Sequence, residues 1–342
     1  VFGAEMLELN HQRKPKDSWK WMIGHCVVSF VSVFLTQFAL SMVPRFFPAS
    51  SLLTLLSLSA IVLLAVAGFG RCCKGLLRVR ASAPAFVFFN ILFVWGVYIA
   101  VIRKVISRLM DIAFHAELVV LVIGLHSILS SDPGFVSSGS SCLDKLVNSP
   151  VSDVEADSEE LEPSTCGTRH EFLAEGVYSS LLSSVSIRRV RYCRHCKAYV
   201  KGFDHHCPAF GNCIGQENHV LFILLLVGFI ISEASYVACS SQFATKSQIL
   251  DRTQWETNLS GNLAISTMLF SLLQVLWQGV FLTWHIYCVC FNIRTDEWIN
   301  WKRYPEFQLV VQPHPGQTIT ETRFINPYDK GVLCNAKEFL KL

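Results

Sequence analysis

Six long apolar stretches constrain the fold of this chain more than any other feature of its sequence. A helix needs about 20 mostly apolar residues to cross the hydrocarbon core of a bilayer, and each stretch reaches or approaches that length. The stretches are Ile23 to Val43, Ala49 to Gly70, Ala85 to Ile102, Ile112 to Leu129, Val220 to Ala238 and Leu263 to Phe291. Charged residues make up only 16% of the chain, against about 25% in a typical soluble protein. The sequence therefore predicts an all-α polytopic membrane protein with about six transmembrane helices.

Basic residues beside the spans predict the orientation, because Lys and Arg in short flanks favour the cytoplasmic side. The N-terminal tail and the second loop are rich in them, whereas the first loop holds only Arg45. This pattern predicts that both termini and the segment between the fourth and fifth spans are cytosolic. The third loop, with Arg103, Lys104 and Arg108, argues against it. The glycosylation sequon Asn258-Leu259-Ser260 falls in the fifth loop, which this topology makes lumenal or extracellular.

The predicted organisation has six parts along the chain. They are a cytosolic N-tail (1–22), four transmembrane helices (23–129), a flexible cytosolic linker (130–190), a Cys- and His-rich module (191–219), two transmembrane helices (220–291) and a cytosolic C-terminal region (292–342). The linker is predicted from its Ser-rich, acidic composition, which provides no core of its own. The net charge of +3 is too small to indicate a nucleic-acid partner.

The Cys- and His-rich module has the composition of a zinc site. Its four tightly clustered cysteines lie beside histidines, so a metal site is favoured over a set of disulfides. Cys193 and Cys196 form a Cys-x2-Cys knuckle, whose two thiolates can share one tetrahedral Zn²⁺. His206 and Cys213 supply two further ligands and complete a closed, structural Cys₃His set. A segment this short and loop-rich buries too little apolar surface to fold without metal.

Three residues that the zinc site does not need lie next to one of its ligands. They are Asp204, His205 and Cys207. An imidazole within hydrogen-bond reach can take the proton of a thiol, and a carboxylate on its far nitrogen sets the tautomer. Asp204, His205 and Cys207 therefore have the composition of an orienting group, a base and a nucleophile. The alternative is a purely structural zinc knuckle in which Cys207 is itself a ligand.

At these residues the chain resembles the DHHC-type protein S-acyltransferases, or palmitoyltransferases. The resemblance rests on several motifs in the family's order and covers roughly residues 112 to 335. The motifs are Asp132-Pro133-Gly134, Phe203 to Pro208, Asn212 to Gly215 with Asn218 and Phe222, Thr295-Asp296-Glu297, and Asn326 to Asn335. Arg294 stands where the family's Thr-Thr-x-Glu motif has its first threonine. The first two spans resemble an extra hairpin on a four-span core.

The resemblance implies protein S-acyltransferase activity with long-chain acyl-CoA as the co-substrate, and palmitoyl-CoA is the expected one. Cys207 would take the acyl group from CoA and pass it to cysteines of membrane-associated proteins. His205 would be the base and Asp204 its partner, with Cys193, Cys196, His206 and Cys213 on zinc. The acyl tail would lie in the lipid bilayer between the spans, gaining about 0.8 kcal/mol per buried CH₂. The implied location is the endomembrane system (ER or Golgi) or the plasma membrane.

The departures from the family pattern concern its first zinc site. Tyr192 and Tyr199 stand where the family has a His and a Cys ligand, and about Ser179 and Leu182 where it has a further Cys pair. One structural zinc ion is therefore predicted instead of two. Ala209 also replaces the Trp that usually follows the Pro. These losses motivate the alternative of a catalytically weak or inactive membrane adaptor with a structural zinc knuckle.

Two histidines near the predicted cytosolic ends of spans four and six are further candidates for the active site. They are His126 and His285. An ionisable residue inside a span is costly and often functional. For these two, however, a structural hydrogen bond is the favoured interpretation.

Overall fold

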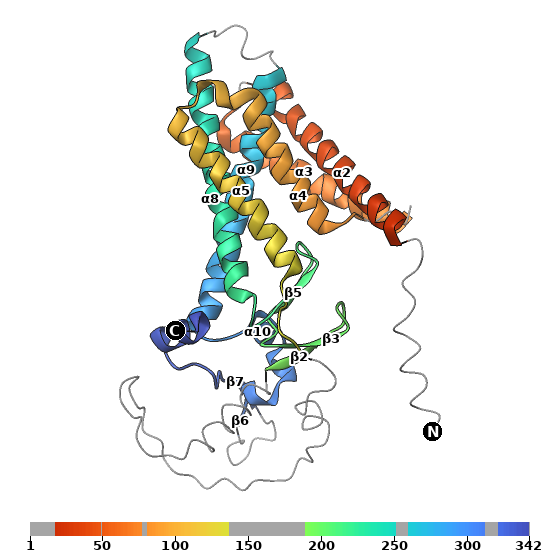
Figure 1. Cartoon of the computed structure of the whole chain (residues 1–342), viewed down its shortest axis with the longest axis vertical. Coiled ribbons are helices and arrows are strands. Elements are labelled where there is room, and N and C mark those ends of the chain that lie inside the picture. The colour runs from red at the N-terminus through yellow and green to blue at the C-terminus, as the bar shows by residue number, and fades with distance from the viewer. Residues whose placement is uncertain are drawn as a thin grey trace. The chain divides into compact units, whose positions relative to one another are not determined.

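The computed structural model of the chain describes residues 18–48, 50–76, 81–136, 189–250, 259–311 and 321–341. Most of the predicted N-tail, most of the predicted linker and Asn258 of the sequon lie outside the described residues. The described chain is mostly helical (Figure 1). It divides into two compact units, and three of the long helices contribute residues to both.

Six helices of the described chain are long and apolar enough to cross a membrane, which confirms the prediction of six spans. They are α2 (Ser18–Phe46), α3 (Leu52–Leu76), α4 (Ala83–Val97), α5 (Arg108–Ser130), α8 (His219–Leu250) and α9 (Leu259–Cys290). The span that begins with α4 continues through a π-helical turn, Tyr98–Ile102, and a 3-10 turn, Arg103–Val105. Most of the helices extend beyond the predicted spans, whereas α3 begins three residues later than predicted and α9 ends one residue earlier.

The first turn between spans differs from the sequence prediction. The first predicted span ends at Val43, just before a proline, but Pro44 lies inside α2. The helical hydrogen-bond pattern even continues one step past Phe46, since the amide of Phe47 donates to the carbonyl of Val43 at 3.1 Å. Proline loses the hydrogen bond to the carbonyl four residues earlier, and its ring crowds that carbonyl, yet two more residues of α2 follow Pro44. The turn therefore falls after Pro44, just before α3.

The first compact unit comprises residues 1–122 and 228–277, and helix α2 packs against α3 and α4 within it. Ser29 on α2 donates to the carbonyl of Ser82 at 2.8 Å and accepts from its amide at 2.9 Å. Ser82 is also the N-cap of α4, so this pair joins the two helices at that end. Val43, Leu55 and Leu269 form a small buried cluster that ties α2, α3 and α9 together.

The second compact unit comprises residues 123–227 and 278–342 and holds every strand of the described chain. Its three small sheets are antiparallel, so the Cys- and His-rich module is not helical. The first sheet has the order β1 (Phe135–Val136), β3 (Ala198–Lys201), β2 (Val190–Cys193). The other two pair β4 (His205–Cys207) with β5 (Asn212–Ile214), and β6 (Gln308–Val311) with β7 (Glu321–Phe324). Two short helices, α10 (Thr295–Asn300) and α11 (Val332–Leu340), complete the unit.

The chain leaves α5 through a tight turn that leads directly into the first sheet. The carboxylate of Asp132 accepts from the amides of Gly134 at 2.8 Å and Phe135 at 2.9 Å, as in an Asx turn. Gly134 has φ +100°, a conformation that favours glycine. The Asp-Pro-Gly motif therefore aims β1 at its partner β3.

Two buried asparagines fasten the module to the end of α5. The amide of Asn212 donates to the carbonyls of Ile128 at 3.0 Å and Ser131 at 2.9 Å. The amide of Asn218 donates to the hydroxyl of Ser131 and to the carbonyl of Cys213, both at 3.0 Å. Because buried polar groups are costly unless paired, these contacts fix β5 and the start of α8 relative to α5.

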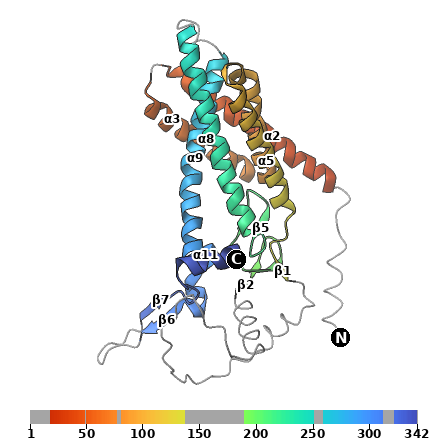
Figure 2. The same ribbon diagram turned by 60° about the vertical axis from the view of Figure 1, so that its left-hand side comes forward.

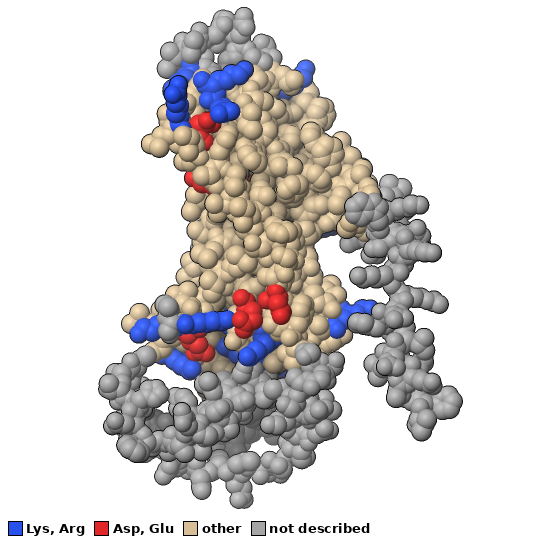
Figure 3. Space-filling view, in the orientation of Figure 1, with Lys and Arg blue, Asp and Glu red and all other residues tan. Residues whose placement is uncertain are grey.

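The C-terminal region is held against the end of α9 in the same way. The amide of Asn335, which is buried on α11, donates to the carbonyl of Cys290 at 2.8 Å; Figure 2 shows α11 beside that end of α9. Arg189, just before β2, forms a bidentate ion pair with Glu297 on α10 at 2.9 and 2.7 Å. In the space-filling view, blue and red side chains gather around this part of the second unit, while its helical part is tan (Figure 3).

Replacing Gly215 by alanine is expected to destabilise the second unit. An added Cβ would lie 2.3 Å from the carbonyl oxygen of Pro133 and 2.6 Å from Val200, and backbone cannot yield as a flexible side chain would. Overpacking of this kind costs about 2 kcal/mol or more. Denaturant unfolding of the purified chain measures the effect. Gly279→Ala on α9 is the matched control, since nothing lies within 4 Å of its Cβ position, and an equal loss in both variants would contradict the prediction.

Candidate active site and metal centre

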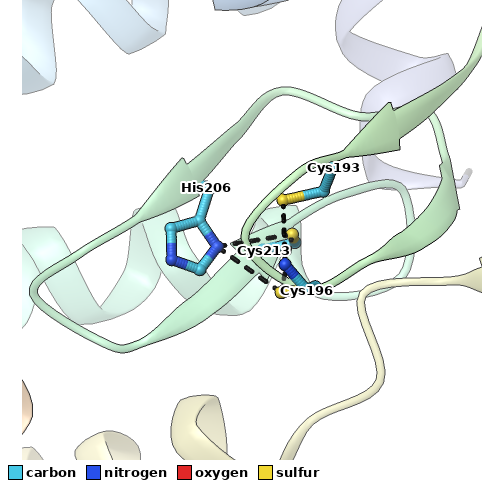
Figure 4. A group of neighbouring side chains, drawn as sticks. All are labelled: Cys193, Cys196, His206 and Cys213. Atoms are coloured by element: carbon cyan, nitrogen blue, oxygen red, sulfur yellow. Dashed lines mark hydrogen bonds between the residues drawn. The ribbon is translucent and has the colours of Figure 1, made fainter. Parts of the chain in front are cut away.

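The four predicted zinc ligands converge in the second unit. The ligand atoms of Cys193, Cys196, His206 and Cys213 all lie within 4.8 Å of one another, and Figure 4 shows the three sulfur atoms and the imidazole turned toward a common centre. Cys193 ends β2, Cys196 lies in the turn before β3, and the other two come from β4 and β5. Residues distant in sequence thus meet only because two antiparallel pairs are adjacent.

The spacing of these atoms fits one tetrahedral zinc ion. The Cys196 and Cys213 sulfurs are 3.4 Å apart, and Nδ1 of His206 lies 3.5 and 3.7 Å from them. With Zn–S about 2.3 Å and Zn–N about 2.0 Å, a tetrahedron places its ligand atoms roughly 3.5 to 3.8 Å apart. Burial raises the pKa of the Cys196 and Cys213 thiols, so a bound cation is what would keep them as thiolates. These residues could therefore hold a structural zinc ion.

Strand alternation separates the metal ligands from the remaining reactive side chains. Successive residues of a strand point to opposite faces, so His205 and Cys207 share one face of β4 while His206 points to the other. His206 is the direct cross-strand partner of Cys213, which places both on the metal face. Cys207 is not part of the metal cluster, contrary to the alternative in which it is a zinc ligand.

Asp204 is held rigidly beside His205. Its carboxylate is completely buried and accepts from Nδ1 of His205 at 2.7 Å and from the amide of Thr295 at 2.9 Å. Its own carbonyl accepts from the amide of Asp296 at 3.0 Å. The Thr295-Asp296-Glu297 motif therefore positions Asp204 through two backbone amides at the start of α10.

The electrostatics of the pair favour an ionised carboxylate and a basic imidazole. Burial alone would raise the pKa of Asp204, but its interactions with His219, His205 and His285 outweigh burial and hold the pKa well below its usual range. Burial alone would lower the pKa of His205, but hydrogen bonds to Asp204 and Cys207 and their charges raise it to about 9. With Nδ1 engaged by Asp204, Nε2 is the nitrogen left for the Cys207 thiol.

Cys207 lies at the end of β4 and is 7% exposed. The side chain of His205 is 21% exposed, and its ring meets Phe222 of α8 edge-on at 5.4 Å between centroids. A buried thiol beside a hydrogen-bonded imidazole and a buried carboxylate is an arrangement that can form a covalent thioester.

Tyr192 and Tyr199, which replace two ligands of the family's first zinc site, contact each other in the structure. Tyr192 and Tyr199 are cross-strand partners in β2 and β3, and their rings pack edge-on with centroids 5.1 Å apart. An aromatic pair of this kind stabilises a strand pair by about 0.5 to 1 kcal/mol. Ring packing thus connects the two positions at which members of the resembled family have a His and a Cys ligand of their first zinc site.

The interpretation of His285 as a structural hydrogen-bonding residue is wrong for the described chain. His285 on α9 is completely buried, yet neither ring nitrogen has a hydrogen-bond partner among the described residues. Its ring contacts those of His205, His219, Phe222 and Phe281. Spacing in the sequence could not reveal this, because the rings meet only through the packing of α8 against α9. His126 is exposed on α5.

Comparison with known proteins agrees with this geometry. Residues 176–302 match the sequence profile of the DHHC palmitoyltransferase family. This stretch of the chain is similar to the DHHC palmitoyltransferases. The matched stretch includes the metal cluster, the segment from Asp204 to Cys207, and α8, α9 and α10.

Curated relatives are similar to this chain over less than half of its length. It is 28% identical to palmitoyltransferase ZDHHC17 of Mus musculus over 162 residues, which cover 45% of this chain and 24% of the relative. It is 32% identical to palmitoyltransferase AKR1 of Mortierella alpina over 127 residues, covering 34% of this chain and 23% of the relative. The matched region thus spans about a quarter of the length of these relatives. Together with the six apolar helices, the similarity identifies an integral membrane protein.

Proposed function

We propose that the chain is a protein S-acyltransferase that moves a long-chain fatty acyl group from acyl-CoA to cysteines of membrane-associated proteins through an acyl-Cys207 intermediate. The observation that carries the proposal is the contact between Asp204 and Nδ1 of His205, on the strand that ends in Cys207. A palmitoyltransferase activity is what the printed names of the relatives state for those proteins.

In the first half-reaction, Nε2 of His205 takes the proton of the Cys207 thiol. The thiolate sulfur then attacks the carbonyl carbon of the acyl-CoA thioester, and a new C–S bond forms as the bond to the CoA sulfur breaks. The proton on His205 passes to the leaving CoA sulfur. Asp204 keeps the imidazole in the required tautomer and stabilises the imidazolium that forms.

In the second half-reaction the same groups act in reverse. His205 takes the proton of a substrate cysteine, and the new thiolate attacks the acyl-Cys207 carbonyl. The acyl group moves to the substrate, and the proton returns to the Cys207 sulfur. Because a thioester is exchanged for a thioester in both steps, neither an oxidant nor an added energy source is required.

The site's place at the end of the helices suits a co-substrate with one polar and one apolar part. The start of α8 and the end of α9, whose rings pack against His205, belong to helices apolar enough to span a membrane. An acyl tail placed among such helices gains about 0.8 kcal/mol per buried CH₂. Because acyl-CoA would be supplied from the cytosol, the DHHC domain and both termini would face the cytosol. The Cys₃His set would hold one structural zinc ion.

The experiment that tests the proposal follows a labelled acyl group through both steps. The purified full chain in lipid nanodiscs is incubated with labelled palmitoyl-CoA, and the label is located by mass spectrometry. The expected result is a hydroxylamine-sensitive thioester on Cys207, which disappears as label accumulates on an added cysteine-containing peptide.

Two outcomes would overturn the proposal. A well-folded chain that takes no label from palmitoyl-CoA would favour the inactive membrane adaptor with a structural zinc knuckle. Label confined to juxtamembrane cysteines such as Cys72 and Cys73, one exposed and one partly buried on α3, would show that the chain is only a substrate for acylation.

A further inference from the structure

The side chain of Arg294 joins the segment after α9 to the start of α8. Its Nη1 is hydrogen-bonded to Nδ1 of His219, the first residue of α8, which is 2% exposed. A guanidinium has only donors, so Nδ1 of His219 accepts this bond. The imidazole is therefore neutral with its proton on Nε2, and the contact with Arg294 fixes that tautomer.

His219 faces the Asp204 carboxylate and His285. One nitrogen of His219, one nitrogen of His285 and one carboxylate oxygen of Asp204 lie within 4.8 Å of one another. Nε2 of His219 is buried and has no hydrogen-bond partner among the described residues. A buried N–H near a buried carboxylate is electrostatically favourable, since an ionised group in a low-dielectric site depends on nearby dipoles and charges.

These three side chains also have the composition of a metal site, but the contact with Arg294 argues against a metal. A ligand nitrogen must offer a lone pair, whereas Nε2 of His219 carries the proton and Nδ1 is engaged. The positively charged guanidinium of Arg294 also interacts electrostatically with the Asp204 and Glu297 carboxylates.

Arg294 is also connected to Asp204 through the backbone of the two residues that follow it. The residue after it, Thr295, donates its amide to the Asp204 carboxylate at 2.9 Å, and the next, Asp296, donates to the Asp204 carbonyl at 3.0 Å. Anchoring the Arg294 side chain to α8 therefore also fixes the two amides that hold Asp204 in place.

We propose that Arg294 and His219 are positioning residues that hold the Asp204–His205 pair in the geometry for proton transfer from Cys207. The inference rests on the proposed acyltransferase function. Arg294 stands where the first threonine of the Thr-Thr-x-Glu motif is expected. The Arg294–His219 contact therefore depends on a residue in which this chain departs from that motif. Neither residue touches the reacting atoms, and both act through Asp204.

A double-mutant cycle tests the inference on the purified full chain. The maximal rate of acyl-Cys207 formation and the palmitoyl-CoA concentration at half-maximal rate are measured for wild type, Arg294→Met, His219→Leu and the double variant. Each single substitution is expected to lower the maximal rate about tenfold, with an unchanged half-maximal concentration, because misplacing a reacting group slows chemistry more than binding. The double variant is also expected to lose about tenfold, since both residues act through one contact.

Rescue variants separate positioning from a merely structural role. His219→Gln keeps an N–H near the position of Nε2, and Arg294→Lys keeps a donor and a charge, so both are expected to recover most of the rate. His126→Leu is the matched control, since His126 is an exposed imidazole on α5. Zinc content is measured for every variant. If His219→Leu or Arg294→Met loses its zinc, only His219→Gln and Arg294→Lys are used to test the inference. Acylation rates close to the wild-type rate in these two variants support it.

The inference and the proposed function fail in different ways. Wild-type protein that forms no acyl-enzyme overturns the proposed function. Wild-type protein that acylates normally, together with Arg294 and His219 variants at the wild-type rate, overturns the inference alone. An additive loss of about a hundredfold in the double variant, or conservative variants as slow as the disruptive ones, overturns it as well.

Discussion

Replacing Cys207 by serine is expected to abolish the hydroxylamine-sensitive acyl-enzyme and to lower peptide acylation by at least about a thousandfold. A serine hydroxyl is far less acidic than a thiol, so His205 cannot generate a comparable nucleophile from it. The substitution is nearly isosteric, and Cys207 lies outside the metal cluster. The expected loss is therefore chemical, with the zinc content and thermal midpoint of the variant unchanged.

The matched control is Cys290→Ser at the end of α9, which removes a partly buried thiol away from the metal cluster. Label and peptide acylation should remain at the wild-type level in this variant. Retained acylation in Cys207→Ser would assign the nucleophile to another cysteine. Loss of zinc from Cys207→Ser would instead place its sulfur on the metal, against the geometry described above.

Replacing Cys213 by serine is expected to release the zinc ion and unfold the module. Cys213 is completely buried, and its sulfur lies within 3.7 Å of two other predicted ligands. Zinc binding contributes on the order of 10 kcal/mol to the folding of small zinc modules. Because β4 carries both a metal ligand and Cys207, losing the metal should also abolish acylation.

Zinc per polypeptide, measured by elemental mass spectrometry, checks this expectation. Wild type should hold about one equivalent, as one closed Cys₃His set requires, and Cys213→Ser close to none. Tyr192→Phe is the control from the same small sheet, since it keeps the ring that packs on Tyr199 and removes only a hydroxyl. Two equivalents in wild type, or full zinc retention in Cys213→Ser, would contradict the assignment of a single site.

The sequence predicted the membrane spans well because apolar length is a local property. Each predicted stretch lies largely within one of the six long helical segments, and no tertiary contact was needed to find it. Helix ends were less predictable. Pro44 lies inside α2 with two helical residues after it, so the helix ends later than the position of the proline suggests.

Residue type and motif were enough to identify the zinc ligands and the Asp204–His205–Cys207 group in the sequence. They did not predict that the two sets lie on opposite faces of one strand. This separation depends on β4 being a strand, since only alternation puts His206 on one face and its two neighbours on the other. Residues 191–219 show no strand periodicity of their own. The strand exists because β5 pairs with it, with Asn212 opposite Cys207.

The contacts around Asp204 were beyond sequence reasoning for a further reason. His219 opens α8, His285 lies near the end of α9, and Arg294 follows that helix. Only the packing of these segments brings the three side chains together. The one available signal was the unusual arginine in place of a threonine, and it gave no indication of which residue Arg294 contacts.

The packed rings of Tyr192 and Tyr199 have a consequence for how the module captures its metal. They lie next to the turn that carries Cys193 and Cys196, so their contact favours the closed form of this hairpin even without an ion. Whenever the hairpin is closed, its two thiols are already close together, and less conformational entropy is lost when they bind the ion. Reloading after chelation should therefore begin at this hairpin, with His206 and Cys213 closing over the ion afterwards.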